Sequence, residues 1–394
     1  MRPVAITAVG VTCGLGHSLS ELSLALLEGR CGIAEVKDLP AARMVLAGDV
    51  PKLQDFPDDR KVHLLAAAAQ AVLSPTDAPP ARRGVYLGTG LSSVTPLELE
   101  QDIFPHVRDG RVDRTTAMAD LATDHVAPRR HLPARATAWL ADAFGAEGPT
   151  GTTFSACAAG AEAIAAGARA IARGDADVVL AGGHDAMAHP LGLLSFDVLG
   201  ALSPTVCRPF DAERDGFTLG EGAALLRLES LDRCSQPPLA VLLGAGTSLD
   251  AHGITAPHPE GRGAEAAMRR ALRDAGIRPD QVDWVNTHGT GTSLGDAAEA
   301  AAISRVFGPR VAVSSLKGAL GHTLAAAGAV EAVATVAALR DGFLPGTVGC
   351  STPAELGVRV ILGAEHTAPR IVVSNSFGFG GQNCSLVFAL EVPV

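Results

Sequence analysis

Short apolar runs that end near glycine alternate with alanine-rich stretches along this chain of 394 residues. Apolar runs typical of strands are VAITAVGV, GVYLGTG, ADVVLAGG and AALLRLES in the first part, then LAVLLGAGT, VDWVNTHGTGT, RVAVSSLKG and IVVSNSFGFGG. Stretches typical of helices that end at glycine are SLSELSLALLEG, AEAIAAGARAIARG, GAEAAMRRALRDAG and LAAAGAVEAVATVAALRDG. This alternation predicts a layered α/β fold.

Two segments, one in each part of the chain, resemble each other. GPTGTTFSACAAGAEAIAAGARAIARG and GPRVAVSSLKGALGHTLAAAGAVEAVATVAALRDG both open with Gly-Pro, continue as a strand through a serine and enter a small-residue helix. A duplicated unit would place a domain boundary near residue 245, giving halves of 1–245 and 246–394. A chance match between alanine-rich helices explains the likeness about equally well, because alanine favours helices everywhere.

The composition excludes several classes of protein. Apolar residues make up 47% of the chain and charged residues 19%, which favours a packed globular enzyme over a disordered protein. The net charge of −10 opposes non-specific nucleic-acid binding. Seven scattered cysteines without a C-x-x-C pair indicate neither a disulfide framework nor a zinc site. Since we find no signal-peptide pattern and no membrane-spanning run, we expect a cytoplasmic protein.

Cys157 is the first candidate for chemistry. It stands at the junction between the run GTTFSA and an alanine-rich helix. The backbone N–H groups and macrodipole at a helix N-terminus lower the pKa of a thiol and stabilise an oxyanion, so this is a position suited to a nucleophile. The alternative is a small buried apolar side chain, which most free cysteines are.

Two histidine-containing segments follow later in the chain. His288 lies in NTHGTGTSLGDAAEA, directly after an apolar run and before a glycine-rich loop. In SSLKGALGHTLAAAGAVE, Lys317 and His322 flank a turn and Glu331 follows on the next helix, which indicates a charge network that orients an imidazole. A single histidine in a sequence is more often structural than catalytic. We predict a structural role for His17, His63, His106, His125, His131, His184, His189, His258 and His366.

The fourth candidate is NSFGFGGQNCS near the C-terminus. Its glycines would suit a phosphate cradle, but the run lacks the G-x-G-x-x-G spacing that opens a helix. We interpret it instead as a flexible loop in which Phe377 and Phe379 form an apolar gate.

Taken in this order, SACAAG, THGTGTSLGD, SSLKGALGH with AAGAVE, and NSFGFGGQN resemble the motifs of β-ketoacyl synthases of the thiolase superfamily. The resemblance is to the acyl-carrier-protein-dependent elongating type, of fatty-acid synthesis and type II polyketide systems. It implies two similar halves, each with a five-stranded mixed sheet, in α-β-α-β-α layers. It also implies an acyltransferase that condenses a Cys-bound acyl chain with malonyl-acyl carrier protein. No metal or other cofactor is expected, since the phosphopantetheine arm belongs to the carrier.

The resemblance assigns roles to individual residues. Cys157 would be the acylated nucleophile, flanked by His288 and His322, with Lys317 and Glu331 supporting His322. The backbone N–H groups of Cys157 and Phe379 would form the oxyanion hole. The implied substrate-binding residues are Thr290, Thr292, Phe217, Phe377 and Leu132. An acidic acyl carrier protein would need a positive docking patch on this acidic chain. The candidates are Arg60, Lys61, Arg129, Arg130 and Arg208, which ordinary solvated surface charges would explain about equally well.

Three residues depart from the family pattern. Gln382 and Cys384 stand where the family usually has threonine and glycine, and Ser293 where proline is common. The resemblance implies a homodimer, with a chain-length-factor heterodimer as the alternative. The alternative function is that of a partner subunit similar to a chain-length factor. That class lacks the nucleophilic cysteine, so Cys157 argues against this alternative. A thiolase would need a second catalytic cysteine, and a chalcone-synthase-like enzyme uses one histidine.

Overall fold

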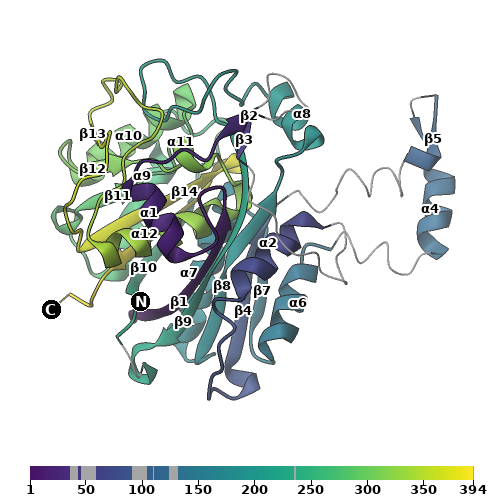
Figure 1. Cartoon of the computed structure of the whole chain (residues 1–394), viewed down its shortest axis with the longest axis horizontal. Helices are drawn as coiled ribbons and strands as arrows, with labels where there is room; N and C mark the ends of the chain where they lie inside the picture. Colours follow the sequence, from purple (N-terminus) through teal and green to yellow (C-terminus); the bar gives the residue numbers. More distant parts are fainter. Residues whose placement is uncertain are drawn as a thin grey trace.

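The computed structural model describes residues 1–35, 43–45, 59–90, 104–109, 111–123, 132–234 and 237–393. Most of its strands lie in one continuous sheet (Figure 1). This sheet consists of two halves with the same topology, called here the first and the second sheet. The first sheet runs β1 (Val4–Cys13), β9 (Leu219–Ser230), β8 (Val178–Ala186), β4 (Arg83–Thr89) and β7 (Thr150–Thr153). The second runs β10 (Ala240–Leu249), β15 (Gln382–Ala389), β14 (Ile371–Gly378), β11 (Trp284–Asn286) and β12 (Ala312–Ser314), with β13 (Arg359–Val360) beyond β12.

The two sheets repeat the same pairing directions. In each, the first two pairs are antiparallel and the next two are parallel. β1 and β10 meet over a short antiparallel stretch that joins the sheets. The prediction of two similar five-stranded halves is therefore confirmed. Residue 245 falls inside β10, and because strand order assigns all of β10 to the second half, we propose a boundary between β9 and β10.

Helices cover both sheets and fill the space between them. α2 (Arg60–Ala69) and α6 (Arg135–Phe144) pack on the outer face of the first sheet. α9 (Arg262–Ala275) and α10 (Ser293–Phe307) cover the outer face of the second. α7 (Ala159–Arg173) and α12 (Ala327–Asp341) contact each other between the sheets, and α1 (Leu19–Leu27) packs on α12. The result is the predicted α-β-α-β-α layering.

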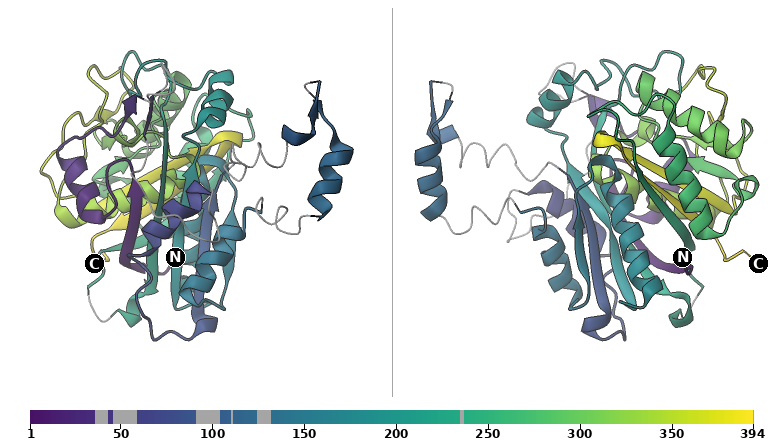
Figure 2. Two further views of the ribbon diagram at one scale, coloured as in Figure 1. Left: turned by 45° about the vertical axis from the view of Figure 1, so that its right-hand side comes forward. Right: turned by 180° about the vertical axis from the view of Figure 1, so that it is seen from behind.

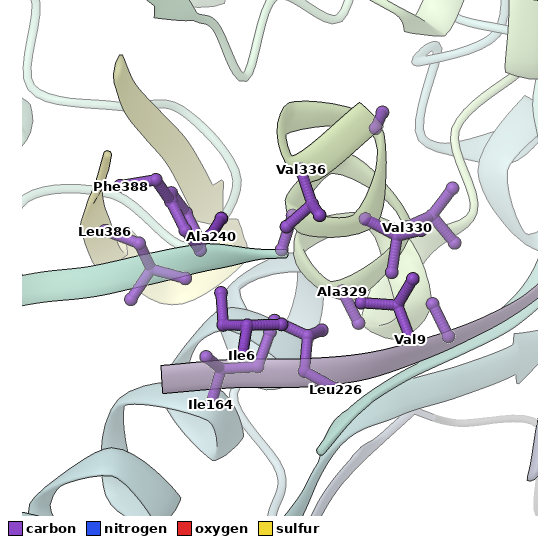
Figure 3. Close-up of a cluster of buried hydrophobic side chains, with 14 of the residues drawn as sticks. Ile6, Val9, Ile164, Leu226, Ala240, Ala329, Val330, Val336, Leu386 and Phe388 are labelled. Atoms are coloured by element: carbon purple, nitrogen blue, oxygen red, sulfur yellow. The ribbon is translucent and has the colours of Figure 1, made fainter. Parts of the chain in front are cut away.

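The central layer depends on small residues. Every residue of α12 from Ala327 to Leu339 is buried, and a Cβ on Gly160 of α7 would lie 2.8 Å from the carbonyl oxygen of Ala325. Apolar side chains from both sheets, among them Ile6 and Phe388, close around these helices (Figure 3). The alanine and glycine that dominate the two repeated segments thus let the central helices approach closely.

The remaining elements are short. The helices are α4 (Arg114–Thr123), α8 (Pro190–Val198) and α11 (Lys317–Leu320), with single 3₁₀ turns at η1 (Pro80–Arg82), η3 (Phe104–His106), η4 (Ala156–Ala158), η5 (Leu231–Arg233), η6 (Pro279–Gln281), η7 (Leu324–Ala326) and η8 (Phe379–Gly381). The strands are β2 (Ala34–Glu35), β3 (Arg43–Val45), β5 (Val107–Arg108) and β6 (Arg111–Val112). β5 and α4 stand to one side of the layered body (Figure 2). No helix in the described part of the chain has the length and apolar character needed to cross a membrane.

Candidate active site

Cys157 lies at the turn that leads from β7 through η4 into α7, as the sequence predicts. The residue before it, Ala156, has φ of 47°, a left-handed conformation that is uncommon for a residue with a Cβ. Such backbone strain concentrates at functional sites, where the surrounding structure holds it. The turn leaves Cys157 6% exposed at the start of the central helix layer.

The equivalent turn of the second half positions His322. Here Leu324 has the left-handed φ, 51°, at the start of η7 before α12. The backbone N–H of His322 donates to Thr218 at 2.7 Å, which ties this turn to the start of β9. The duplicated architecture therefore brings two strained turns together, one carrying the thiol and one following the imidazole.

His322 contacts the Cys157 thiol directly. Nε2 lies 3.1 Å from Sγ, while Nδ1 accepts a hydrogen bond from the Leu324 backbone N–H at 3.3 Å. Because Nδ1 is the acceptor, the ring hydrogen belongs on Nε2, which then donates to the sulfur. The Phe379 backbone N–H is a second hydrogen-bond donor to the same sulfur.

The pKa of Cys157 is raised to about 12, mainly because the thiol is buried. The positive charge of Lys317 and the Phe379 N–H act in the opposite direction without reversing the shift. The sequence-based expectation of a lowered pKa is therefore wrong, because burial disfavours the thiolate more strongly than the donors favour it.

His288 completes an imidazole pair. Its ring centroid lies 5.3 Å from that of His322, with the planes 79° apart. The pKa values of both rings lie well below the ordinary value because of burial first and the charge of Lys317 second. Both rings are therefore neutral at pH 7 and each has one N–H donor. Within the described residues, Nδ1 of His288 is buried without a hydrogen-bond partner.

Lys317 and Glu331 form a buried ion pair behind the histidines. The Lys317 ammonium donates to the Glu331 carboxylate, and both side chains are almost fully buried. Burial raises the pKa of Glu331, and the adjacent ammonium limits that rise. Lys317 acts on His288 and His322 through its charge, which disfavours their protonation.

Two buried carboxylates that the sequence analysis did not single out hold the His288 loop. Glu299 accepts the backbone N–H groups of His288 at 2.9 Å and Gly289 at 2.8 Å. Asp296 accepts the N–H groups of Phe210 at 2.7 Å and Gly291 at 3.1 Å. Burial raises the pKa of Asp296 to about 6 and that of Glu299 to about 7. The sequence signal for this role is the spacing of Asp296 and Glu299, which lie three residues apart in a segment otherwise rich in alanine.

The glycine-rich segment forms the hairpin between β14 and β15. A Cβ on Gly378 would lie 3.1 Å from the backbone nitrogen of Cys157, so glycine lets the hairpin approach the nucleophile closely. The ring of Phe377 lies 5.9 Å from that of His288. The segment closes a strand hairpin and opens no α-helix, which rules out the helix N-terminus that a phosphate cradle needs.

Two cavities meet at Cys157. The smaller, of about 90 Å³, is lined by His288, His322 and their surroundings. The larger, of about 440 Å³, extends toward α8 and the start of β15. Four residues line both cavities: Cys157, Phe196, Leu324 and Phe379.

The predicted substrate-binding residues divide into two groups. Thr290, Thr292, Phe217 and Phe377 line the smaller cavity, and the Oγ1 atoms of the two threonines lie 2.9 Å apart. Phe217 also packs edge-on against His322 at 5.2 Å. Leu132 is 56% exposed and lines neither cavity, so we do not retain it.

The predicted docking residues also divide. Arg60 is 43% exposed and pairs with buried Glu221 at 2.5 Å, and Arg208 pairs with Glu213 at 3.4 Å. Lys61 is only 5% exposed, so its inclusion in a docking surface is wrong: its position on α2 turns it into the interior. Arg129 and Arg130 lie outside the described residues.

Taken together, the geometry is that of a thiol acyltransferase. A nucleophilic sulfur, two neutral imidazoles and backbone N–H groups converge where two cavities meet. In the described ranges, no group of three or more His, Cys, Asp or Glu side chains is arranged to hold a metal ion. Cys384 is buried in β15 and lines neither cavity, so it offers no second nucleophile at the site.

Comparison with known proteins defines the family. The N-terminal domain of β-ketoacyl synthases matches residues 59–233, and the C-terminal domain matches residues 239–351. The chain belongs to the β-ketoacyl synthase family, with the thiolase-like fold that the sequence predicts.

Relatives and solved structures match this chain over nearly its whole length. The chloroplastic 3-oxoacyl-[acyl-carrier-protein] synthase II of Arabidopsis thaliana is 34% identical over 98% of this chain and 76% of its own length. The 3-oxoacyl-[acyl-carrier-protein] synthase 2 of Staphylococcus aureus (strain N315) is 33% identical over 98% of both. A ketosynthase from Xenorhabdus doucetiae, solved with its chain length factor, has a TM-score of 0.81 and 32% identity, covering 99% of this chain and 98% of its own.

Proposed function

We propose that this chain extends acyl chains by decarboxylative Claisen condensation, joining an acyl group on Cys157 to malonyl-acyl carrier protein. The observation that carries the proposal is the Cys157 thiol at the meeting point of two cavities, 3.1 Å from Nε2 of His322. One cavity holds the histidine pair and the threonines, and the other offers the space that an acyl chain needs. The pathway is fatty-acid or type II polyketide chain elongation.

The first step loads the acyl chain. The Cys157 sulfur attacks the carbonyl carbon of an acyl thioester on the carrier, and the carrier thiol leaves with the proton of the Cys157 thiol. Because burial keeps the resting thiol protonated, the hydrogen bonds from His322 and Phe379 matter most as negative charge develops on sulfur. The larger cavity receives the acyl chain.

The second step uses both imidazoles. Malonyl thioester loses carbon dioxide, and the electron pair of the broken bond becomes an enolate with its charge on the thioester oxygen. Neutral His288 and His322 donate their N–H groups to that oxygen in a water-poor site. Thr290 and Thr292 line the same cavity and would contact the phosphopantetheine arm.

The third step forms the carbon–carbon bond. The enolate carbon attacks the carbonyl of acyl-Cys157, and the backbone N–H groups of Cys157 and Phe379 stabilise the resulting oxyanion. Collapse of this intermediate expels the Cys157 thiolate and releases a β-ketoacyl thioester on the carrier. The expelled thiolate takes up one proton from solvent water, because the original thiol proton left with the carrier thiol in the first step. The carrier supplies the phosphopantetheine arm.

The partners follow from this scheme. The named activities of the relatives act on acyl carrier protein, which supports the same partner here. We propose a homodimer, with a heterodimer formed with a chain-length factor as the alternative that the Xenorhabdus doucetiae complex illustrates. A cytoplasmic location stays a prediction, since one relative is chloroplastic.

The proposal is tested by mass spectrometry of the pure protein. Incubation with octanoyl carrier protein should add an octanoyl group to Cys157, and malonyl carrier protein should then release the extended β-ketoacyl product. Cys157→Ala should abolish the adduct. His288→Ala should retain it while slowing condensation about a hundredfold, since one oxyanion donor is worth roughly that factor. Condensation at the normal rate in Cys157→Ala would overturn the proposed nucleophile.

A further inference from the structure

The larger cavity at Cys157 contains polar side chains as well as apolar ones. Phe154, Met187 and Leu199 give it the apolar surface that a hydrocarbon chain requires. Four polar side chains share this lining: Asp185, His189, Ser195 and Gln382. A cavity built for a saturated chain gains nothing from such groups, because covering them with hydrocarbon removes water from them without replacement.

Two of these four side chains already form hydrogen bonds within the protein. The Ser195 hydroxyl donates to the carbonyl oxygen of Leu191 at 2.7 Å, one turn earlier in α8. The Asp185 carboxylate accepts backbone N–H groups from Ala186 at 3.0 Å and Ala325 at 3.2 Å. Neither provides a donor for a bound chain.

Gln382 differs because its side-chain amide has no hydrogen-bond partner in the part of the chain that the structure describes. It begins β15 and pairs with Gly378 across the hairpin that carries Phe379. A Cβ on Gly380 would lie 3.6 Å from its Nε2 atom, which places the amide beside this hairpin. Gln382 also stands where the family pattern has threonine, so the longer amide is a feature of this chain.

His189 supplies a second donor near α8. Its Nδ1 accepts the backbone N–H of Gly192 at 3.2 Å and thereby caps the helix. Burial lowers the pKa of His189, so the neutral ring has its hydrogen on Nε2. The purely structural role predicted from the sequence therefore accounts for only one of its two nitrogens.

We propose that Gln382 and His189 make this cavity selective for acyl chains that carry a keto or hydroxyl oxygen, in preference to saturated chains of equal length. The inference rests on the proposed function, because it assigns the cavity to the Cys157-bound chain. An oxygen on the chain accepts a hydrogen bond from the amide or the imidazole. A saturated chain leaves these donors desolvated and unpaired, and a site built to bind an oxygen rejects an analogue that lacks it.

The test compares acylation rates of Cys157 by intact-protein mass spectrometry. The probes are octanoyl-pantetheine and analogues with one keto or hydroxyl oxygen at the third, fifth or seventh carbon. We expect at least one oxygenated probe to acylate Cys157 about tenfold or more faster than octanoyl-pantetheine, the factor for about 1.4 kcal/mol. Gln382→Leu should bring this ratio close to one.

Two further variants sharpen the result. His189→Asp keeps an acceptor for the Gly192 N–H, but its carboxylate has no hydrogen-bond donor, so it should reduce the preference for the probe whose oxygen reaches α8. Ser195→Ala is the matched control: it lies in the same cavity with its hydroxyl already bound to Leu191, and the ratio should stay unchanged. Octanoyl loading of each variant reports that the nucleophile and fold are intact.

The outcomes separate the two proposals. If octanoyl and all oxygenated probes load the wild type at equal rates, or if Gln382→Leu leaves an existing preference intact, the selectivity assigned to these residues is refuted. If no probe acylates Cys157 in the wild type, the proposed condensing function itself fails, and this inference with it.

Discussion

At the scale of single residues, the site combines groups whose effects oppose each other. Burial raises the pKa of the Cys157 thiol, while Lys317 and the Phe379 N–H lower it. Burial lowers the pKa of both histidines, which keeps them neutral donors. These residues are tuned less by their own chemistry than by what the fold places around them.

The thiol should therefore react faster as the pH rises. Because its pKa is raised, Cys157 is protonated at pH 7, and its thiolate fraction increases about tenfold per pH unit above neutrality. The iodoacetamide alkylation rate, followed by peptide mass spectrometry, should climb through pH 9 without levelling. Exposed Cys31 in the same digest serves as an internal standard. A plateau at or below pH 7 would show that the donors outweigh burial.

The ion pair of Lys317 and Glu331 should be essential to stability at alkaline pH. Lys317→Met leaves a buried carboxylate without its cation, which should lower the free energy of unfolding by about 3 kcal/mol at pH 8. Burial raises the pKa of Glu331 above its unfolded value, so the folded variant takes up a proton and the loss should shrink at pH 5. Chemical denaturation at both pH values measures this.

A double variant provides the control for this prediction. Lys317→Met with Glu331→Gln removes the charge as well as its partner, so it should recover part of the loss at pH 8. A loss of equal size at pH 5 and pH 8 in the single variant would contradict the assignment to an uncompensated carboxylate.

At the scale of elements, the hairpin between β14 and β15 decides whether the oxyanion donors converge. Gly378→Ala would place a Cβ 3.1 Å from the Cys157 nitrogen and push the hairpin away from it. Displacing the Phe379 donor should slow acylation of Cys157 by about a hundredfold. Stopped-flow acylation and thermal unfolding, measured together, separate loss of activity from loss of fold.

Gly363→Ala is the matched control for the hairpin variant. A Cβ there meets no atom within 4 Å, so both the acylation rate and the melting temperature should stay at the wild-type value. If Gly378→Ala acylated as fast as Gly363→Ala, the hairpin would not be an oxyanion donor.

At the scale of the whole molecule, an enzyme with net charge −10 must still receive an acidic carrier. Local positive charge therefore has to steer docking against the overall field. Of the residues predicted for this role, Arg60 and Arg208 remain partly exposed and Lys61 is buried. We therefore propose Arg60 and Arg208 as docking residues and leave Lys61 out.

Arg208→Glu should raise the KM for the carrier roughly fivefold at low ionic strength and leave kcat unchanged, because a charge at the rim changes the association rate. The effect should fade in high salt as the charges are screened. Arg278→Glu, an exposed arginine paired with Asp280 after α9, is the control and should leave the KM unchanged. Equal KM values for the two variants at low salt would remove Arg208 from the docking surface.

Most of the fold follows from local pattern. The apolar runs became β1, β4, β8, β9, β10, β11, β12 and β14, and the alanine-rich stretches became α1, α7, α9 and α12. β15 lies outside the predicted strands, because QNCSLVFAL follows the glycine-rich run for which the sequence predicts a loop. α10 was also missed, since its first turn continues the glycine and threonine segment after His288.

By itself, the sequence determined which groups are available and which turns carry them, because glycine, alanine and apolar spacing act locally. Only the tertiary structure decided which groups meet. Cys157 and His322 are 165 residues apart in the chain, and the pairing of two duplicated halves brings them into contact. The burial of a side chain depends on every neighbouring element at once. It raises the pKa of the Cys157 thiol and keeps Lys61 in the interior, while the same packing leaves Gln382 in the lining of a cavity. No local pattern contains that information.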